Sequence, residues 1–177
     1  MIVSISGTPG TGKTAVAKIL AKKLGAKLIS ISKLLNELDC KWDKERRTKI
    51  IDIKDLQKTV KKHLVKRKIN IIEGHLSHLL NSDIVIILRC NPRVLEKRLK
   101  KKGWKKEKIK ENVEAEILDE ISHESMQKNA CEIDTSSKKP AATAMLIERV
   151  LKNPKGYKFL HIGNIDWSEK YKNYLRD

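Results

Sequence analysis

Five short segments of the chain are rich in β-branched and other apolar residues. Each is bounded by polar residues or glycine, and near-continuous apolar runs of this length are typical of strands covered on both faces of a sheet. The segments therefore predict five buried strands, at residues 1–6, 27–31, 69–73, 84–89 and 131–134.

The segments between these strands repeat apolar residues at helical spacing, and several carry helix-end signals. Gly25 follows one segment as a C-cap, and Asn91-Pro92 supplies an N-cap followed by proline. Alternating strands and helices predict an α/β fold with a parallel sheet, right-handed crossovers and ligands at the carboxyl ends of the strands. The predicted helices are residues 14–24, a short one capped by Ser32 through Leu38, 55–68, 92–102, 107–129 and 140–151.

Two segments depart from this pattern. Residues 39–53 are dense in charge and lack periodicity, so we expect a mobile connection there. Residues 157–177 hold five of the seven aromatic side chains, which indicates a separate functional or packing element. The domain prediction is therefore a main domain at 1–152 and an aromatic, basic C-terminal extension at 153–177.

Residues 7–14, GTPGTGKT, match the phosphate-loop pattern G-x-x-x-x-G-K-[ST]. Gly10 and Gly12 let backbone N–H groups turn toward phosphates, and the following helix adds the positive end of its dipole. Lys13 is suited to bridge the β- and γ-phosphates of ATP, and the hydroxyl of Thr14 is suited to bind Mg²⁺. The alternative is a glycine turn that matches by chance, but the predicted strand before it and helix after it favour a nucleotide site.

A carboxylate and a histidine follow the predicted strand at 69–73. Glu73 ends this apolar strand, and Gly74 and His75 come next. Glu73 is a candidate metal-water ligand or base, and His75 is a candidate for orienting a water molecule or polarising a phosphate oxygen. The alternatives are a capping or solvated role for Glu73 and a surface hydrogen bond for His75.

The formal net charge of +17 favours contact with polyanions such as nucleotides or RNA. The alternative is a solvated Lys-rich surface without a partner beyond ATP. Cys40, Cys90 and Cys131 lie far apart and show no C-x-x-C spacing, so they predict neither a zinc site nor disulfides. With no signal peptide and no apolar run of spanning length, we expect a cytoplasmic protein with no membrane contact.

Three stretches, residues 7–14, Glu73-Gly74-His75 and residues 88–117, carry a resemblance to a known family. The chain resembles the atypical adenylate kinases of archaea and eukaryotes, which include nuclear adenylate kinase isoenzyme six and a maturation factor of the small ribosomal subunit. The resemblance runs from residue 1 to about residue 151. It implies a three-layer P-loop nucleoside monophosphate kinase fold, with a mobile insert for the monophosphate at about 30–53 and a lid at about 101–111.

The resemblance also assigns roles to single residues. Lys102 stands where relatives often have an ATP-contacting arginine, and Glu73 stands where eukaryotic members have aspartate before their histidine. Arg46 and Arg47 are the nearest substitutes for an arginine that grips the acceptor phosphate. The residues that match the ATP-binding loop, the motif histidine and the arginines flanking the lid helix are Gly10, Gly12, Lys13, Thr14, Ala15, His75, Arg89 and Arg98.

The function implied is a Mg²⁺-dependent kinase, ATP + AMP ⇌ 2 ADP, with ATPase activity and a role in maturing the small ribosomal subunit. Its partners would be a platform ribosomal protein and rRNA. One alternative is a nucleotide-switched assembly ATPase with incidental kinase activity, and another is a small-metabolite kinase of the same fold. Aromatic and basic residues of the extension suit stacking on bases, or equally an aromatic strap packed on the protein's own surface.

Overall fold

A five-stranded parallel sheet forms the centre of the computed structural model, which describes residues 1–38, 41–43 and 48–175. The strand order is β2-β5-β1-β6-β7, with Ile5 opposite Glu73 on one side and Ile86 on the other. The prediction of an α/β fold with this sheet is therefore confirmed. The strands are β1 (Ile2–Ser6), β2 (Lys27–Ser30), β5 (Asn70–Glu73), β6 (Ile84–Arg89) and β7 (Ala130–Asp134).

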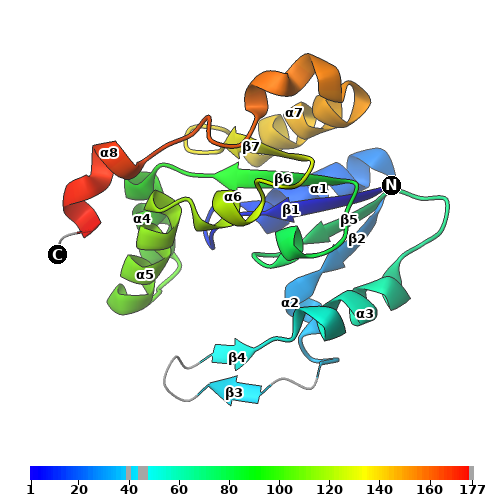
Figure 1. Cartoon of the computed structure of the whole chain (residues 1–177), viewed down its shortest axis with the longest axis horizontal. Helices are drawn as coiled ribbons and strands as arrows, with labels where there is room; N and C mark the ends of the chain where they lie inside the picture. The colour runs from blue at the N-terminus through cyan, green and yellow to red at the C-terminus, as the bar shows by residue number, and fades with distance from the viewer. Residues whose placement is uncertain (39–40, 44–47, 176–177) are drawn as a thin grey trace.

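Helices cover both faces of the sheet (Figure 1). On one face, α1 and α7 pack side by side, and Leu20 and Ile147 join the sheet residue Ile86 in one core. On the other face, a second core forms where Leu56 and Val60 meet β2 and β5. The helices of the two faces are α1 (Lys13–Leu24), α7 (Pro140–Lys152), α2 (Ile31–Leu34), α3 (Ile53–His63), η1 (Ser77–Leu79) and α6 (Glu120–Glu124).

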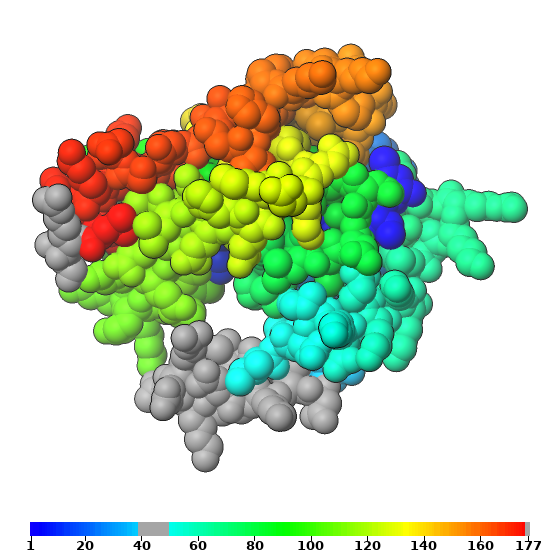
Figure 2. All heavy atoms as spheres, viewed as in Figure 1, coloured from blue at the N-terminus to red at the C-terminus, as the bar shows by residue number. Residues whose placement is uncertain are grey.

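A third core lies beyond the carboxyl ends of the strands, where α4 (Pro92–Lys101) packs on α5 (Lys106–Ile117). Asn91 caps α4 as predicted, because its Oδ1 accepts from the backbone N–H of Arg93 at 3.1 Å. The C-terminal extension crosses the surface from α7 to this pair of helices, as Figure 2 shows in orange and red. It contains η2 (Pro154–Leu160), α8 (Ser168–Tyr171) and η3 (Lys172–Leu175).

Several predicted boundaries are wrong. The long helix expected at 107–129 is two helices, α5 and α6, because Asp119 adopts a left-handed conformation with φ of 54°. The carboxylate of Asp119 pairs there with Arg89, which holds the break in place. The helix expected at 55–68 runs from Ile53 to His63, because Leu64 is extended with a ψ of 135°. The side chain of Asn70 then bonds the backbone N–H and carbonyl of Val65 across the turn that follows.

Two further expectations differ in the region before α3. The helix expected to follow Ser32 begins at Ile31 and ends at Leu34, so Ser32 lies inside it. Part of the segment expected to be an irregular connection at 39–53 forms an antiparallel pair, β3 (Lys41–Asp43) and β4 (Thr48–Ile50). Cys40, Arg46 and Arg47 lie outside the described residues. In the part of the chain that the structure describes, no helix is long and apolar enough to cross a membrane.

Candidate active site

The phosphate loop connects β1 to α1 at the carboxyl edge of the sheet. Gly7 has a φ of 134°, and a Cβ at this position would lie 2.3 Å from the carbonyl oxygen of Leu88. Only glycine allows the loop to pass this close to β6. Gly12, with a φ of 101°, then turns the chain into the first residue of α1. The predicted strand, loop and helix are therefore all present.

Lys13 lies folded back over the loop that precedes it. Its Nζ donates to the carbonyl oxygens of Gly7 at 2.7 Å and Thr8 at 3.1 Å. Burial lowers the pKa of Lys13 to about 8, although the nearby Glu73 and Glu116 act in the opposite direction. The ammonium therefore stays mostly protonated at neutral pH and places a positive charge at the helix start.

Glu73, at the end of β5, is buried and bridges two hydroxyl groups. Its Oε2 accepts from Oγ1 of Thr14 at 3.0 Å, and its Oε1 accepts from Oγ of Ser30. The predicted pair of Thr14 and Glu73 therefore lies together, and the solvated alternative for Glu73 is wrong. The sequence-based prediction of the site missed Ser30, which ends β2 in register with Glu73. The polar residue at the end of an apolar strand is a signal in the sequence, but the pairing of β2 with β5 is not.

The Thr14 and Glu73 pair offers the oxygen ligands that Mg²⁺ prefers. Magnesium is usually bound by one or two protein oxygens together with substrate phosphates and water. Among the described residues, no group of three or more His, Cys, Asp or Glu side chains could hold a metal ion by itself. The residues present thus fit a magnesium ion that arrives with a nucleotide.

His75 lies on the loop after β5, and its side chain remains exposed to solvent. Its backbone carbonyl accepts from Oγ of Ser6 at 3.0 Å, which ties the loop to the end of β1. Partial desolvation lowers the pKa of His75 to about 4, and the charges of Lys13, His78 and Lys108 add to the effect. The imidazole is therefore neutral at pH 7.

His78, also on this loop, is buried, unlike His75. Its Nδ1 lies 2.9 Å from Oγ of Ser6, and its Nε2 lies 2.6 Å from Oε2 of Glu124. Burial lowers the pKa of His78, against the raising effect of Glu124. His78 thus anchors the loop that carries His75.

A cavity of about 570 Å³ opens beside the phosphate loop. Three parts of the chain line it: the loop and start of α1, the end of α4, and the turn that joins β7 to α7. Its lining residues are Gly10, Thr11, Gly12, Ala15, Val16, Arg98, Lys101, Lys102, Thr135, Lys138, Pro140 and Thr143. Four of the six residues expected to bind ATP line the cavity, whereas Lys13 and Thr14 are not among its lining residues. The four are Gly10, Gly12, Ala15 and Lys102.

The turn after β7 escaped the sequence-based prediction of the site. Thr135 packs under the phosphate loop, with its Oγ1 2.9 Å from the carbonyl oxygens of Thr11 and Arg89. Arg98 reaches it from α4 and donates to its carbonyl oxygen at 2.8 Å. The only signal in the sequence is the polar run after the fifth strand, which sits at the carboxyl edge like the other site loops.

The two arginines expected beside the lid helix have different surroundings. Arg98 lines the cavity, whereas the guanidinium of Arg89 is buried and pairs with Glu116, Asp119 and Glu132. Arg89 also donates to the carbonyl oxygen of Ile165 at 3.2 Å, so the cluster holds the C-terminal extension.

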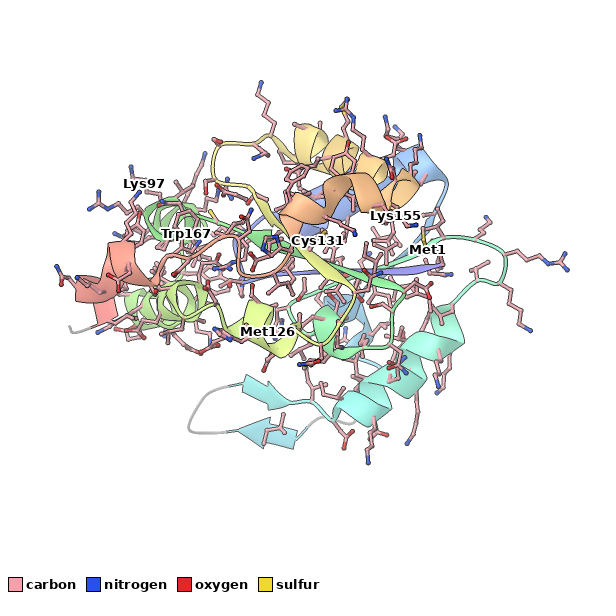
Figure 3. The ribbon with its side chains drawn as sticks, turned by 45° about the horizontal axis from the view of Figure 1, so that its top comes forward. Met1, Lys97, Met126, Cys131, Lys155 and Trp167 are labelled. Carbon is pink, nitrogen blue, oxygen red and sulfur yellow. The ribbon has the colours of Figure 1, made fainter. Side chains whose placement is uncertain are left out.

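The aromatic residues of the extension mostly pack on the protein itself. Tyr171 is buried, and its hydroxyl donates to Oδ1 of Asn91 at 2.8 Å. Trp167 packs on the same core, between the extension and α4 (Figure 3). Phe159 is 60% exposed. The contacts of Trp167 and Tyr171 favour the strap alternative over base stacking for this part of the extension.

Comparison with known proteins adds to this geometry. Residues 3–119 match the model of a family described as an AAA domain. A protein of Methanocaldococcus jannaschii named "Putative adenylate kinase" is 40% identical over 177 residues, covering 99% of this chain and 97% of its own. The chain belongs to this archaeal family. Another member, from Pyrococcus abyssi, bears the same name and is 38% identical, with 99% of this chain and 98% of its own covered.

Family members thus align over nearly the whole chain, including the C-terminal extension. Solved structures support the fold at lower identity. Shikimate kinase from Acinetobacter baumannii has a TM-score of 0.63 and 17% identity, covering 87% of this chain and 94% of its own. Thymidylate kinase from Candida albicans has a TM-score of 0.57 and 16% identity, covering 89% of this chain and 93% of its own.

Proposed function

We propose that this protein is a nucleoside monophosphate kinase that catalyses ATP + AMP ⇌ 2 ADP. An oxygen of the AMP phosphate would form a bond to the γ-phosphorus of ATP, while the bond from that phosphorus to the β,γ-bridging oxygen breaks. The observation that carries the proposal is the grouping of Lys13, Thr14 and Glu73 at the phosphate loop, whose residues Gly10 and Gly12 line the 570 Å³ cavity. The names of the archaeal relatives give the reaction class.

The phosphate loop would hold the triphosphate by charge and by backbone donors. Phosphoryl transfer needs little covalent help from the protein, so positioning and charge stabilisation supply most of the catalysis. Lys13 provides a cation at the loop, and the first turn of α1 provides N–H groups without helical partners. Lys102 lines the cavity beside the loop, and we expect its charge to act on the same phosphates.

Thr14 and Glu73 would hold Mg²⁺, with the hydroxyl as a direct ligand and the carboxylate binding its water shell. Magnesium bound with ATP offsets negative charge on the phosphates. Ser30 donates to the other oxygen of Glu73, so the carboxylate keeps one orientation before any ligand arrives. This preorganisation is the role we assign to Ser30.

His75 would serve the reaction in its neutral form. A neutral imidazole both accepts and donates hydrogen bonds, so it can orient an attacking oxygen without adding charge. In the absence of an acceptor, the same group would orient water, and this accounts for the ATPase activity that we include in the proposal. The pKa of about 4 keeps the imidazole neutral across the physiological range.

The role in maturation of the small ribosomal subunit stays a prediction from the resemblance alone. So do the contacts with a platform ribosomal protein and with rRNA. No contact in the described residues favours the assembly ATPase or the small-metabolite kinase over the nucleotide kinase, so both remain as arms of the test.

The test is an acceptor panel with purified protein and Mg²⁺-ATP. ADP formation is measured with AMP, CMP, UMP, shikimate or no acceptor, for the wild type and Lys13→Ala. We expect AMP to stimulate ADP formation well above the acceptor-free rate, and Lys13→Ala to abolish both rates while circular dichroism shows an intact fold. Equal ADP formation with and without every acceptor would refute the kinase and leave an ATPase.

A further inference from the structure

Glu116, at the end of α5, is a buried carboxylate that lines no part of the nucleotide cavity. The residue is only 2% exposed, and both carboxylate oxygens accept hydrogen bonds from the protein. Oε1 accepts from Nε of Arg89 at 2.9 Å and from the backbone N–H of Cys90 at 2.9 Å. Oε2 accepts from Oγ1 of Thr8, inside the phosphate loop, at 2.5 Å.

Thr8 makes the hydrogen bonds that fix the first half of the phosphate loop. Its carbonyl oxygen accepts from Nζ of Lys13 at 3.1 Å and from the N–H and hydroxyl of Thr11 at 3.2 and 2.9 Å. Its side chain is buried and bonded to Glu116. Gly7, just before it, is pressed against the carbonyl of Leu88. The loop is thus fixed at its base, while its second half faces the cavity.

Arg89 in turn holds Glu116 in one orientation. Besides the bond to the Glu116 carboxylate, its Nη2 donates to the Glu116 carbonyl oxygen at 3.0 Å, and its Nη1 donates to Glu132 at 3.0 Å. Burying such an ion network costs several kcal/mol in desolvation, and apolar residues of similar volume often give equal or greater stability. Because this network is costly to bury and its Glu116 bonds the phosphate loop, we expect it to have a role other than stability.

We propose that Glu116, oriented by Arg89, is a positioning residue that holds the phosphate loop in its nucleotide-binding shape through Thr8. The inference rests on the proposed binding of ATP by this loop. It also ties the loop to α5, whose first half lies within the lid expected at about 101–111. Lys108 and Asn112 precede Glu116 on this helix at spacings of four residues. The side-chain amide of Asn112 donates to the carbonyl oxygen of Lys108 at 2.6 Å along this face.

The test replaces the hydroxyl of Thr8 without changing its shape. Thr8→Val removes the donor to Glu116, and Thr8→Ser restores it. Hydrogen bonds to charged groups contribute roughly 1.5–3 kcal/mol, so we expect Thr8→Val to weaken ATP binding about tenfold or more. Affinity is measured by titration with a fluorescent ATP analogue in the absence of acceptor, and KM for ATP and kcat are measured with AMP.

Two controls separate positioning from stability. Thr59→Val makes the same change at a buried threonine on α3, away from the loop, and should leave affinity for the analogue unchanged. Thr8→Val in a Glu116→Gln background should weaken binding less than threefold further, because contacting partners are not additive. Circular dichroism and urea unfolding show whether each variant is folded at the assay temperature.

The proposal is overturned if Thr8→Val lowers the unfolding midpoint but leaves the dissociation constant and KM for ATP within twofold of the wild type. It is also overturned if Thr8→Ser binds as weakly as Thr8→Val. Because the titration contains no acceptor, a wild type that binds ATP without phosphorylating AMP would refute the proposed function and leave this test intact.

Discussion

Replacing Arg89 with methionine tests the buried cluster on which the inference rests. Methionine fills a similar volume but leaves Glu116, Asp119 and Glu132 facing one another without their cation. Removing one partner of a buried ion pair typically costs about 3–5 kcal/mol. Against a usual domain stability of about 5–15 kcal/mol, this loss is about a fifth of the stability at the least and all of it at the most.

The loss should depend on pH in a stated direction. Burial raises the pKa of Glu116 and of Asp119 even in the wild type, where Arg89 opposes the rise. Without Arg89 these pKa values rise further, so the folded protein binds protons more tightly than the unfolded chain. Stability is then lost as pH rises through the folded pKa values, because the folded state holds more protons than the unfolded one. The deficit of Arg89→Met should be larger at pH 8 than at pH 5.5.

The assay is urea unfolding at pH 5.5 and pH 8, followed by tryptophan fluorescence and circular dichroism. Arg89→Lys is the matched control, because it keeps a charge but cannot form the forked contacts, and it should fall between the wild type and Arg89→Met. If Arg89→Met lay within about 1 kcal/mol of the wild type at pH 8, or lost the same stability at both pH values, the reasoning on this cluster would be refuted.

Three further predictions concern single side chains. In the nucleotide-free protein, an NMR titration of the His75 imidazole should have its midpoint near pH 4. Because the unfolded chain holds this proton up to about pH 6.5, this group should make the free energy of unfolding rise as pH increases from the folded pKa to about 6.5. A midpoint near the ordinary histidine value would contradict the desolvation. Lys102→Arg should tighten ATP binding by calorimetry, because a guanidinium fork replaces a point charge, and equal or weaker affinity would remove Lys102 from the site. Tyr171→Phe removes the bond to Asn91 and should cost about 0.5–1.5 kcal/mol in thermal unfolding; an unchanged midpoint would show that this contact adds nothing to the attachment of the extension.

The features of the site that lie close together in the sequence could be predicted from it. The phosphate loop is eight consecutive residues between a strand and a helix, and Glu73 ends an apolar strand, so local pattern and parallel topology together place Lys13, Thr14 and Glu73 at one edge. Ser30 and Thr135 could not be found in this way. Their roles depend on which strands are neighbours in the sheet, and a single sequence does not state the strand order.

The errors at helix ends share a physical cause. Nothing in the helical spacing of residues 107–129 marks the break, which exists because Asp119 turns to meet an arginine 30 residues earlier. Just after α3, the side chain of Asn70 likewise forms hydrogen bonds with the backbone of Val65, where the spacing predicts further helix. In both places a tertiary contact overrides local propensity, which differs by less than about 1 kcal/mol among ordinary residues.

The fate of the γ-phosphate is the most direct test of the central claim. ATP labelled with radioactive phosphorus in its γ-phosphate is incubated with AMP, Mg²⁺ and either the wild type or Lys13→Ala, and the products are separated by thin-layer chromatography. The account predicts that the label passes from ATP into ADP, that AMP is consumed in step, and that Lys13→Ala transfers none. Label released only as inorganic phosphate, with AMP unchanged, would contradict it.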